Sequence, residues 1–285
     1  MATLFAFLAL IGWGTGDIFV TIASRKIGNV HAYFWGFLLA LILTTLYIPF
    51  AGEFPEIGMF IVAFLINIIH SLGNISYFRA LEVGNASIVG TISGGGFPVV
   101  AVLMSIFFFG ETPSLLQLVA IFLVVSGIVL SSLDISLLKE KGLKGAISNS
   151  GVPYAIGGML GWGISLSLIR IPVETIGWFW SLYPIYLIAL ILPIFKRVRK
   201  NIFKVFRASS IVTVIVLYTL LVTMADFAYN IGILSGYTST VAPIAGAFPV
   251  LFVVLSRFVF HERLNPQQKI GITSSLVGVV LISLT

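Results

Sequence analysis

The amino-acid sequence predicts an all-α polytopic membrane protein, in which ten transmembrane helices form two inverted five-helix repeats. Three observations support this fold class. Of the 285 residues, 59% are hydrophobic and only 9% are charged, whereas a soluble domain carries about 25% charged residues. The chain divides into apolar runs close to the ~20 residues that a helix needs to cross a bilayer. Similar motifs also occur in the same order in both halves of the chain.

Ten apolar runs are expected to span the membrane, joined mostly by short polar segments. These runs are residues 3–23, 32–50, 57–77, 86–109, 115–133, 152–170, 176–195, 210–232, 236–259 and 267–284. The longest connections are 134–151 and 196–210. We therefore expect a first five-helix repeat at 1–133, a linker at 134–151 and a second repeat at 152–285.

Recurring motifs relate the two halves. The sequence FPVV at Phe97 recurs as FPVL at Phe248, and GWG at 12–14 recurs at 161–163. A shared order over a whole half indicates an internal duplication. Because each half has an odd number of spans, the second half must have the opposite orientation in the bilayer, as in many secondary transporters.

The basic residues support the inversion independently. All sixteen Lys and Arg residues except Arg170 fall on one side of the expected topology. Loops rich in Lys and Arg stay in the cytoplasm, so both termini are expected outside it, in a multi-pass protein of the cell membrane. The net charge of +6 then reflects topology, and nucleic acid is not an expected partner.

Three segments resemble a known family. FFFGETPSLLQLVAIFLVVSGIVL, from Phe107, and RFVFHERLNPQQKIGITSSLVGVVLIS, from Arg257, each look like the end of an EamA domain. YFRALEVGNASIV, from Tyr77, resembles the link between the third and fourth helices of that domain. Two such domains are similar to the ten-helix drug/metabolite transporter superfamily, which implies transport of small polar metabolites through a central cavity. Many relatives are drawn with both termini in the cytoplasm, whereas the Lys and Arg distribution here predicts termini outside it.

Two polar stripes, one in each half, are the candidate substrate pathway. The stripe in 210–232 includes Asp226, and a charged side chain costs roughly 2.5–3.5 kcal/mol to insert at membrane depth. A shift of 152 residues superposes Asn74 on Asp226, so an inverted repeat would set the stripes across one cavity. The candidates are Asn67, Ser71, Asn74, Tyr77, Thr219, Thr223, Asp226, Tyr229, Asn230, Tyr183 and Tyr186. Each Ser, Thr or Asn taken singly also fits a hydrogen bond between helices, worth about 0.6 kcal/mol.

Asp17 is the other acid well inside an expected span, and it shares a helix face with Trp13. Its counterpart in the second half is Leu166, so any role is asymmetric. Asp17 could bind a cationic group, carry a proton or extend its carboxylate to the interface. His70 could partner either acid or be a neutral core histidine. Asp17, His70 and Trp13 are therefore the candidate ion or proton site.

Small residues and prolines recur in the fourth and ninth spans, in TISGGGFPVVAV from Thr91 and APIAGAFPVLFV from Ala242. Small residues let helices pack closely where lipid provides no hydrophobic drive. Each proline removes a backbone hydrogen bond, so the same positions could also be hinges. The candidate hinge or packing residues are Gly94, Gly95, Gly96, Pro98, Gly246 and Pro249.

These patterns predict a secondary active transporter that moves a small organic metabolite by alternating access, with proton coupling as an option. An amino acid or related compound is the favoured substrate, and a sugar or nucleotide sugar is the alternative. We expect no enzymatic activity, cofactor or metal. The expected partners are the small-molecule substrate, the lipid bilayer and a coupling proton, and a homodimer is left open.

A rival class is suggested by GTGD at Gly14, which fits the GxGD pattern of intramembrane aspartyl proteases. Asp17 and Asp226 would then be a pair of acids that activates water. The pattern is short for a glycine-rich span, and ten spans in an inverted repeat are not the plan of these proteases. A channel would need a ring or filter of repeated polar groups, which the sequence does not display.

Overall fold

The computed structural model describes residues 1–109, 114–132, 151–199, 202, 209–235, 244–262 and 264–282. Over these residues the secondary structure is helical and contains no strand, which confirms the all-α prediction. Nearly all of the expected linker at 134–151 lies outside the described residues.

Ten principal helices make up the described part of the chain. The first half contains α1 (Ala2–Ile27), α2 (Asn29–Thr45), α3 (Ile57–Val83), α4 (Ala86–Phe109) and α5 (Leu115–Ser132). The second half contains α7 (Val152–Leu168), α8 (Arg170–Leu187), α10 (Ser209–Ser235), α12 (Phe248–Phe260) and α13 (Pro266–Ile282). Shorter elements are η1 (Ile48–Phe50), η2 (Ile188–Ile194) and α9 (Lys196–Arg199). The ten expected spans correspond one to one with these principal helices.

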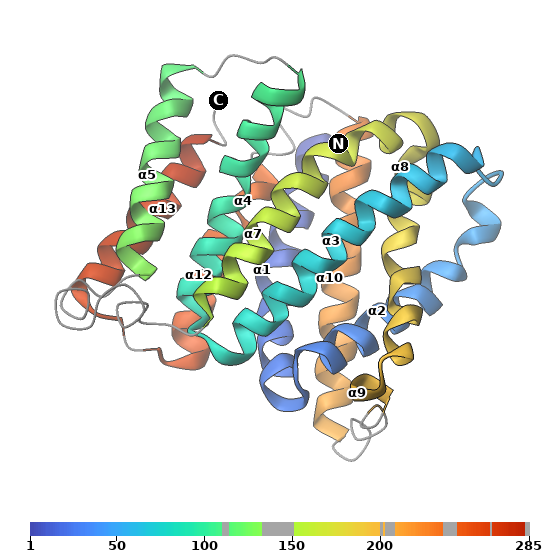
Figure 1. The fold of residues 1–285 in the computed structure, drawn as a ribbon, viewed down its shortest axis with the longest axis horizontal. Helices are drawn as coiled ribbons and strands as arrows, with labels where there is room; N and C mark the ends of the chain where they lie inside the picture. Colours follow the sequence, from blue (N-terminus) through green and yellow to red (C-terminus); the bar gives the residue numbers. More distant parts are fainter. Residues whose placement is uncertain are drawn as a thin grey trace.

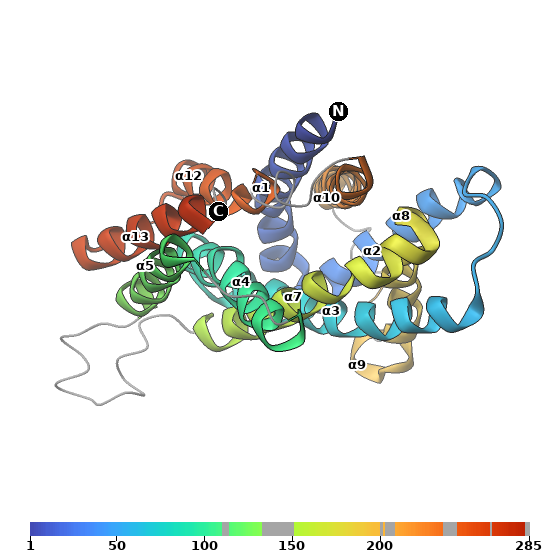
Figure 2. The same ribbon diagram turned by 90° about the horizontal axis from the view of Figure 1, so that it is seen from above.

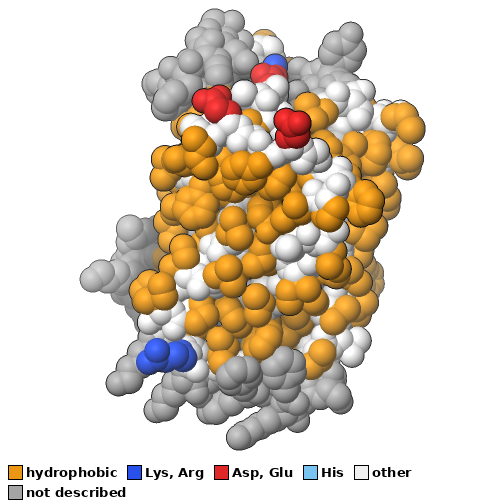
Figure 3. Space-filling model, turned by 90° about the vertical axis from the view of Figure 1, so that its right-hand side faces the viewer, with side chains coloured by type: hydrophobic (Ala, Val, Ile, Leu, Met, Phe, Trp, Pro, Cys, Tyr) orange, Lys and Arg blue, Asp and Glu red, His pale blue; other side chains and the backbone are white. Residues whose placement is uncertain are grey.

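The outer surface of the molecule is apolar between two charged ends. Within the described residues, four stretches are long and apolar enough to cross a membrane: Ala2–Ile27, Ile57–Val83, Arg170–Ile194 and Ser210–Gly232. The same part of the chain contains five shorter apolar helical stretches: Asn29–Thr45, Ala86–Val100, Leu115–Ser131, Val152–Leu168 and Ile244–Phe260. Figure 3 shows a broad hydrophobic band on one face, with acidic side chains and part of a Lys or Arg side chain above it and Lys or Arg below it. An apolar surface of this extent suits contact with lipid.

Charge separates between the two ends as the topology requires. In Figure 1, α1 begins and α13 ends in the upper half of the view, and α9, with its basic sequence KRVR, lies at the lower end. Arg25 and Lys26 close α1 at this lower end, and Arg257 lies in the last turn of α12. The inversion of the repeats therefore places equivalent loops at opposite ends.

The helix contacts follow a pseudo-two-fold relation between the halves. The first helix of each half packs against the third helix of the other, so that α1 lies along α10 and α7 lies along α3. The first helix also contacts the fourth helix of the other half, in the pairs α1 with α12 and α7 with α4. Helices α5 and α13 pair at one side of the molecule (Figures 1 and 2). Each repeat thus completes its packing on its counterpart.

The closest crossings involve glycine. A Cβ atom added at Gly12 of α1 would lie 2.7 Å from Ala225 Cβ of α10. At the equivalent crossing, a Cβ atom added at Gly161 of α7 would lie 2.5 Å from Gly73 Cα of α3. Real Cβ atoms do not approach other carbons this closely, so a larger residue requires the helices to separate.

Gly161→Ala is expected to lower the free energy of unfolding by about 1–3 kcal/mol, because the added methyl group meets the backbone of Gly73 and not a movable side chain. Thermal unfolding of the purified protein in detergent measures the effect. Gly58→Ala is the control, because an added Cβ there meets only the end of the Glu56 side chain, at 3.2 Å. Equal melting temperatures for the two variants would contradict the tight crossing.

The candidate hinge residues lie in two different local structures. Helix α4 continues through Pro98, whereas α12 begins at Phe248 and has Pro249 in its first turn. Ala247 has φ −81° and ψ 1°, which interrupts the helical path after Gly246. Gly94 packs on Pro249, since a Cβ atom added there would lie 2.7 Å from Pro249 Cγ. The expected single run at 236–259 is described only from residue 244 and is broken at 247.

Glu262 ties the two halves together at the basic end. Its carboxylate accepts hydrogen bonds from the backbone N–H groups of Ala86 (2.6 Å) and Ser87 (3.0 Å) in the first turn of α4. The Ser87 hydroxyl donates a further bond at 2.9 Å, and Arg25 of α1 forms an ion pair at 3.3 Å. A carboxylate at a helix N-terminus is favoured by the helix dipole and by the unpaired N–H groups there.

Glu262→Gln is expected to destabilise the protein by about 1–3 kcal/mol, because an amide can accept fewer of these bonds and carries no charge for Arg25. The matched control is Glu174→Gln, which removes an exposed ion pair with Arg170 and should cost less than about 1 kcal/mol. Thermal unfolding of both variants in detergent provides the comparison. A loss of stability in Glu174→Gln as large as that in Glu262→Gln would show that the bonds of Glu262 to the first turn of α4 contribute nothing specific.

Candidate functional site

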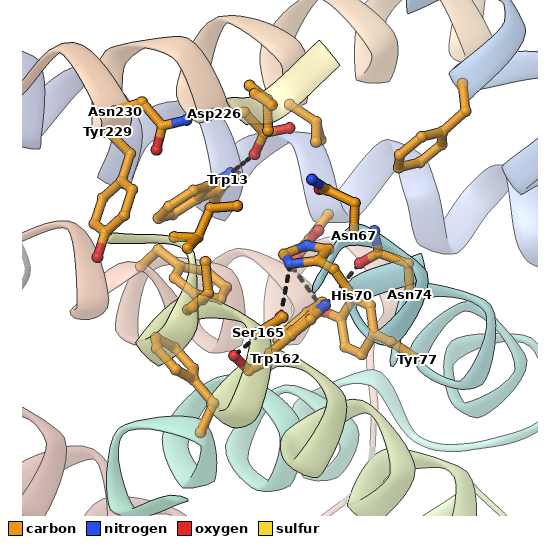
Figure 4. Close-up of a pocket in the computed structure, with 18 of the residues that line it drawn as sticks. Trp13, Asn67, His70, Asn74, Tyr77, Trp162, Ser165, Asp226, Tyr229 and Asn230 are labelled. Atoms are coloured by element: carbon orange, nitrogen blue, oxygen red, sulfur yellow. Dashed lines mark hydrogen bonds between the residues drawn. The ribbon is translucent and has the colours of Figure 1, made fainter. Parts of the chain in front are cut away.

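A central cavity lies where the two repeats meet, between α1, α3, α7 and α10. It is lined by Trp13, Asp17, Val20, Phe37, Ile66, Asn67, His70, Asn74, Tyr77, Phe78, Phe97, Trp162, Ser165, Leu166, Ile169, Leu182, Val222, Asp226, Tyr229, Asn230 and Phe248. Figure 4 shows the labelled side chains around this space. No Lys or Arg is present among the lining residues.

Asp226 is held at the cavity by the first helix of the other repeat. The indole N–H of Trp13, on α1, donates to Asp226 Oδ1 at 2.8 Å (Figure 4). The hydroxyl of Tyr186, on α8, lies 3.5 Å from Asp226 Oδ2. Trp13 directly follows Gly12, and Asp226 directly follows Ala225, so the close crossing of α1 and α10 brings this donor and acceptor together.

The equivalent crossing repeats this contact with an uncharged acceptor. The indole N–H of Trp162, on α7, donates to Asn74 Oδ1 at 2.7 Å. Trp162 directly follows Gly161, and Asn74 directly follows Gly73, at the crossing of α7 and α3. The hydrogen bond from a tryptophan to the facing helix therefore occurs at both crossings, and its acceptor is the Asp226 carboxylate at one and the Asn74 amide at the other.

Asp17 lies on the same helix as Trp13, one turn further along, and is only 6% exposed. The hydroxyl of Tyr77, on α3, donates to Asp17 Oδ2 at 2.8 Å. The equivalent position on α7 is Leu166, which also lines the cavity but carries no charge. Both acids thus belong to the α1–α10 pair, and the α3–α7 pair contributes no Asp or Glu to the lining. Asp17 and Asp226 do not hydrogen-bond to each other in the described structure.

His70 faces the cavity from α3, and its Nδ1 lies 2.9 Å from Ser165 Oγ on α7 (Figure 4). Neither Asp17 nor Asp226 is its hydrogen-bond partner. Among the described residues no group of three or more His, Asp or Glu side chains is arranged to hold a metal ion.

Aromatic rings surround the cavity in pairs related by the repeat. The ring of Trp13 lies 5.3 Å from that of Tyr229, and the ring of Trp162 lies 4.6 Å from that of Tyr77, between centroids. Phe97 of α4 and Phe248 of α12 stack on each other, with centroids 6.3 Å apart and planes 22° apart. Since Phe97 and Phe248 are equivalent residues, their contact lies near the pseudo-two-fold axis.

The structure brings nine of the candidates from sequence to the cavity and leaves five outside its lining. Those at the cavity are Trp13, Asp17, Asn67, His70, Asn74, Tyr77, Asp226, Tyr229 and Asn230. The others are buried between helices and are Ser71, Thr219, Thr223, Tyr183 and Tyr186. Three of these connect neighbouring helices: Thr219 donates to the Gly36 carbonyl at 3.3 Å, the Tyr183 hydroxyl lies 2.9 Å from Thr45 Oγ1, and the Tyr186 hydroxyl donates to Asp226 at 3.5 Å.

Twelve lining residues were not among the candidates, and they include Phe97, Trp162, Ser165 and Phe248. Trp162 could have been found, because it is the counterpart of Trp13 in the recurring GWG motif. Phe97 and Phe248 begin the recurring FPV motif that relates the halves. Ser165 carries no comparable signal, since its role as a partner of His70 depends on the packing of α7 against α3.

Replacing each cavity tryptophan by phenylalanine separates the two indole hydrogen bonds. Trp13→Phe is expected to cost about 1.5–3 kcal/mol, because it removes the donor to a carboxylate, and Trp162→Phe about 0.5–1.5 kcal/mol, because its acceptor is an amide. Thermal unfolding at pH 8 measures both losses, and each variant keeps an aromatic ring. If Trp162→Phe lost more stability than Trp13→Phe, the hydrogen bond to the carboxylate would not be the stronger of the two.

Comparison with known proteins gives a family match over nearly the whole chain. The model of the EamA-like transporter family matches residues 1–133 and 149–284. A solved structure titled "Crystal structure of protein" is similar in fold, with a TM-score of 0.60 and 17% sequence identity; the similarity covers 98% of this chain and 95% of the other. No curated protein matches the sequence.

Proposed function

Since the chain belongs to the EamA-like transporter family, and is thus a membrane transporter of the drug/metabolite superfamily, we propose that it moves a small organic metabolite by secondary active transport. The central cavity is the proposed substrate site. The observation that carries the proposal is the meeting of equivalent residues from two inverted repeats around one polar cavity: Trp13 with Asp226, and Trp162 with Asn74.

The same arrangement supports alternating access. The crossings of α1 with α10 and of α7 with α3 are equivalent but inverted, so a change in one that opens the cavity to one side is matched by a change in the other toward the opposite side. The local difference between continuous α4 and interrupted α12 supports hinges at the candidate glycines and prolines, because the two repeats then hold different conformations of one motif.

Compounds that carry an ammonium group, amino acids and related amines, are the proposed substrate class, because this group suits the carboxylates of Asp17 and Asp226. A nucleotide sugar carries phosphates, which both acids would repel and no basic lining residue would attract. An acid inside the membrane domain can also carry a proton, so we propose that one of the two couples transport to the proton gradient. The protease alternative has no support, because each acid is engaged by an aromatic donor and the family consists of transporters.

We further propose that the protein resides in the cell membrane with its basic end in the cytoplasm. Arg25, Lys26 and Arg257 lie at the end of the molecule that also carries α9, and positive charge favours the cytoplasmic side. This orientation leaves the start of α1 and the end of α13 outside. Residues 1–133 and 152–285 are the proposed repeats, with 134–151 between them.

Flux measurements in proteoliposomes test the proposed function. A panel of amino acids, amines, sugars and nucleotides is offered with and without an imposed pH gradient. Uptake of at least one substrate, stimulated by the gradient and reduced tenfold or more by Asp226→Asn or Asp17→Asn, is the expected result, because the acids bind the substrate or the proton. Glu174→Gln, at an exposed ion pair outside the cavity, is the control that should transport normally. Full activity in both Asp variants would assign the acids to helix packing only.

A further inference from the structure

We infer that the central cavity selects small organic cations that lack a carboxylate, and that these cations compete with protons for the site. This inference rests on the proposed transport function and narrows its substrate class. Three independent features of the cavity lead to it: its charge, the engagement of its donors and the placement of its aromatic rings.

The cavity has negative groups and no positive one to balance them. Asp17 and Asp226 both line it, and none of the residues that surround it is Lys or Arg. Besides the two acids, the titratable side chains that line the cavity are His70 and Tyr77 on α3 and Tyr229 on α10, and Tyr186 on α8 donates to Asp226. The one titratable side chain of α12 is Arg257, which lies outside this lining and donates to the Glu262 carbonyl at the basic end. A carboxylate at membrane depth needs a partner charge or a proton.

Several donors that could bind a substrate carboxylate are already engaged. Asn67 Nδ2 donates to the carbonyls of Ala63 and Ser181, both at 2.8 Å. The Trp162 N–H bonds to Asn74, and His70 pairs with Ser165. A free amino acid would therefore bring its carboxylate into a cavity with two acids and without a free cationic group among the lining residues. Unpaired burial of such a charge is strongly unfavourable.

The aromatic rings add a second means of binding a cation. Trp13 contacts Tyr229 and Phe248, at centroid distances of 5.3 and 5.6 Å, on the side of the cavity that carries Asp226. Ring faces attract ammonium groups, by about 0.5–2 kcal/mol each when water is excluded. Because the indole N–H of Trp13 points to Asp226, one side chain links the carboxylate and the aromatic wall. The opposite wall includes Leu166 and Asn74, which suit the uncharged part of a ligand.

The same carboxylates cannot hold a cation and a proton at once. When an ammonium group enters, a proton bound to the carboxyl group leaves to water, and the charge of the site stays balanced. Reprotonation from the other side then releases the cation. Substrate and proton consequently move in opposite directions across the membrane.

Binding of three matched probes to the purified full-length protein tests the inference. The probes are 2-phenylethylamine, a cation; 2-phenylethanol, its neutral counterpart; and phenylalanine, which adds a carboxylate to the amine. Quenching of tryptophan fluorescence, checked by calorimetry, is expected to give tenfold or tighter binding for the amine than for either other probe. Lowering the pH from 8 to 6 should weaken amine binding at least threefold. Equal or tighter binding of phenylalanine, or binding that does not change with pH, would overturn the inference.

Variants identify the groups involved. Asp226→Asn and Trp13→Phe should each weaken the binding of 2-phenylethylamine at least fivefold, and Glu174→Gln should leave it unchanged. If the cavity variants do not fold, the probe and pH series on the unaltered protein still decide the question. Amine binding without transport in proteoliposomes would refute the proposed transport function but support organic cations as the ligand class. Transport of amino acids without amine binding would support the transport function and refute the selection of cations that lack a carboxylate.

Discussion

The structure depends on the close approach of helices at small residues. Between lipid-exposed helices the hydrophobic effect provides no drive for association, so packing and hydrogen bonds must suffice. Gly12 meets Ala225 where α1 crosses α10, and Gly161 meets Gly73 where α7 crosses α3. At both crossings the next residue on each helix takes part in the indole hydrogen bond at the cavity. The contact that joins the repeats therefore also builds the site.

This coupling explains why the polar groups of the cavity are tolerated in the membrane. Trp13 and Tyr77 supply donors to Asp226 and Asp17, each from a helix other than that of the acid. A donor on a neighbouring helix satisfies the carboxylate only while the crossing stays closed. Packing and polarity thus stabilise each other at these crossings.

Much of this architecture could be predicted from the sequence, because its signals are periodic and duplicated. Apolar run lengths gave the ten helices, and the shift that superposes Asn74 on Asp226 placed two equivalent positions at one cavity. Contacts that depend on packing could not be predicted, such as the pairing of His70 with Ser165. Each polar stripe also includes residues outside the cavity. Thr219 lies on the same helix face as Asp226, but it bonds to the Gly36 carbonyl of α2. Spacing along a helix defines a face, whereas the neighbouring helices decide which part of that face meets open space.

The difference between the two halves of the cavity bears on how such a protein can evolve. An antiparallel pair of identical five-helix chains would carry every acid twice, so its cavity would hold a symmetric set of charges. Joining two copies in one chain allows each copy to mutate alone. Leu166 is the counterpart of Asp17, Asn74 is the counterpart of Asp226, and all four line the cavity, so the fused chain carries half the charge that strict symmetry would impose. Duplication preserved the helical framework, and the loss of strict symmetry left both acids on one pair of helices.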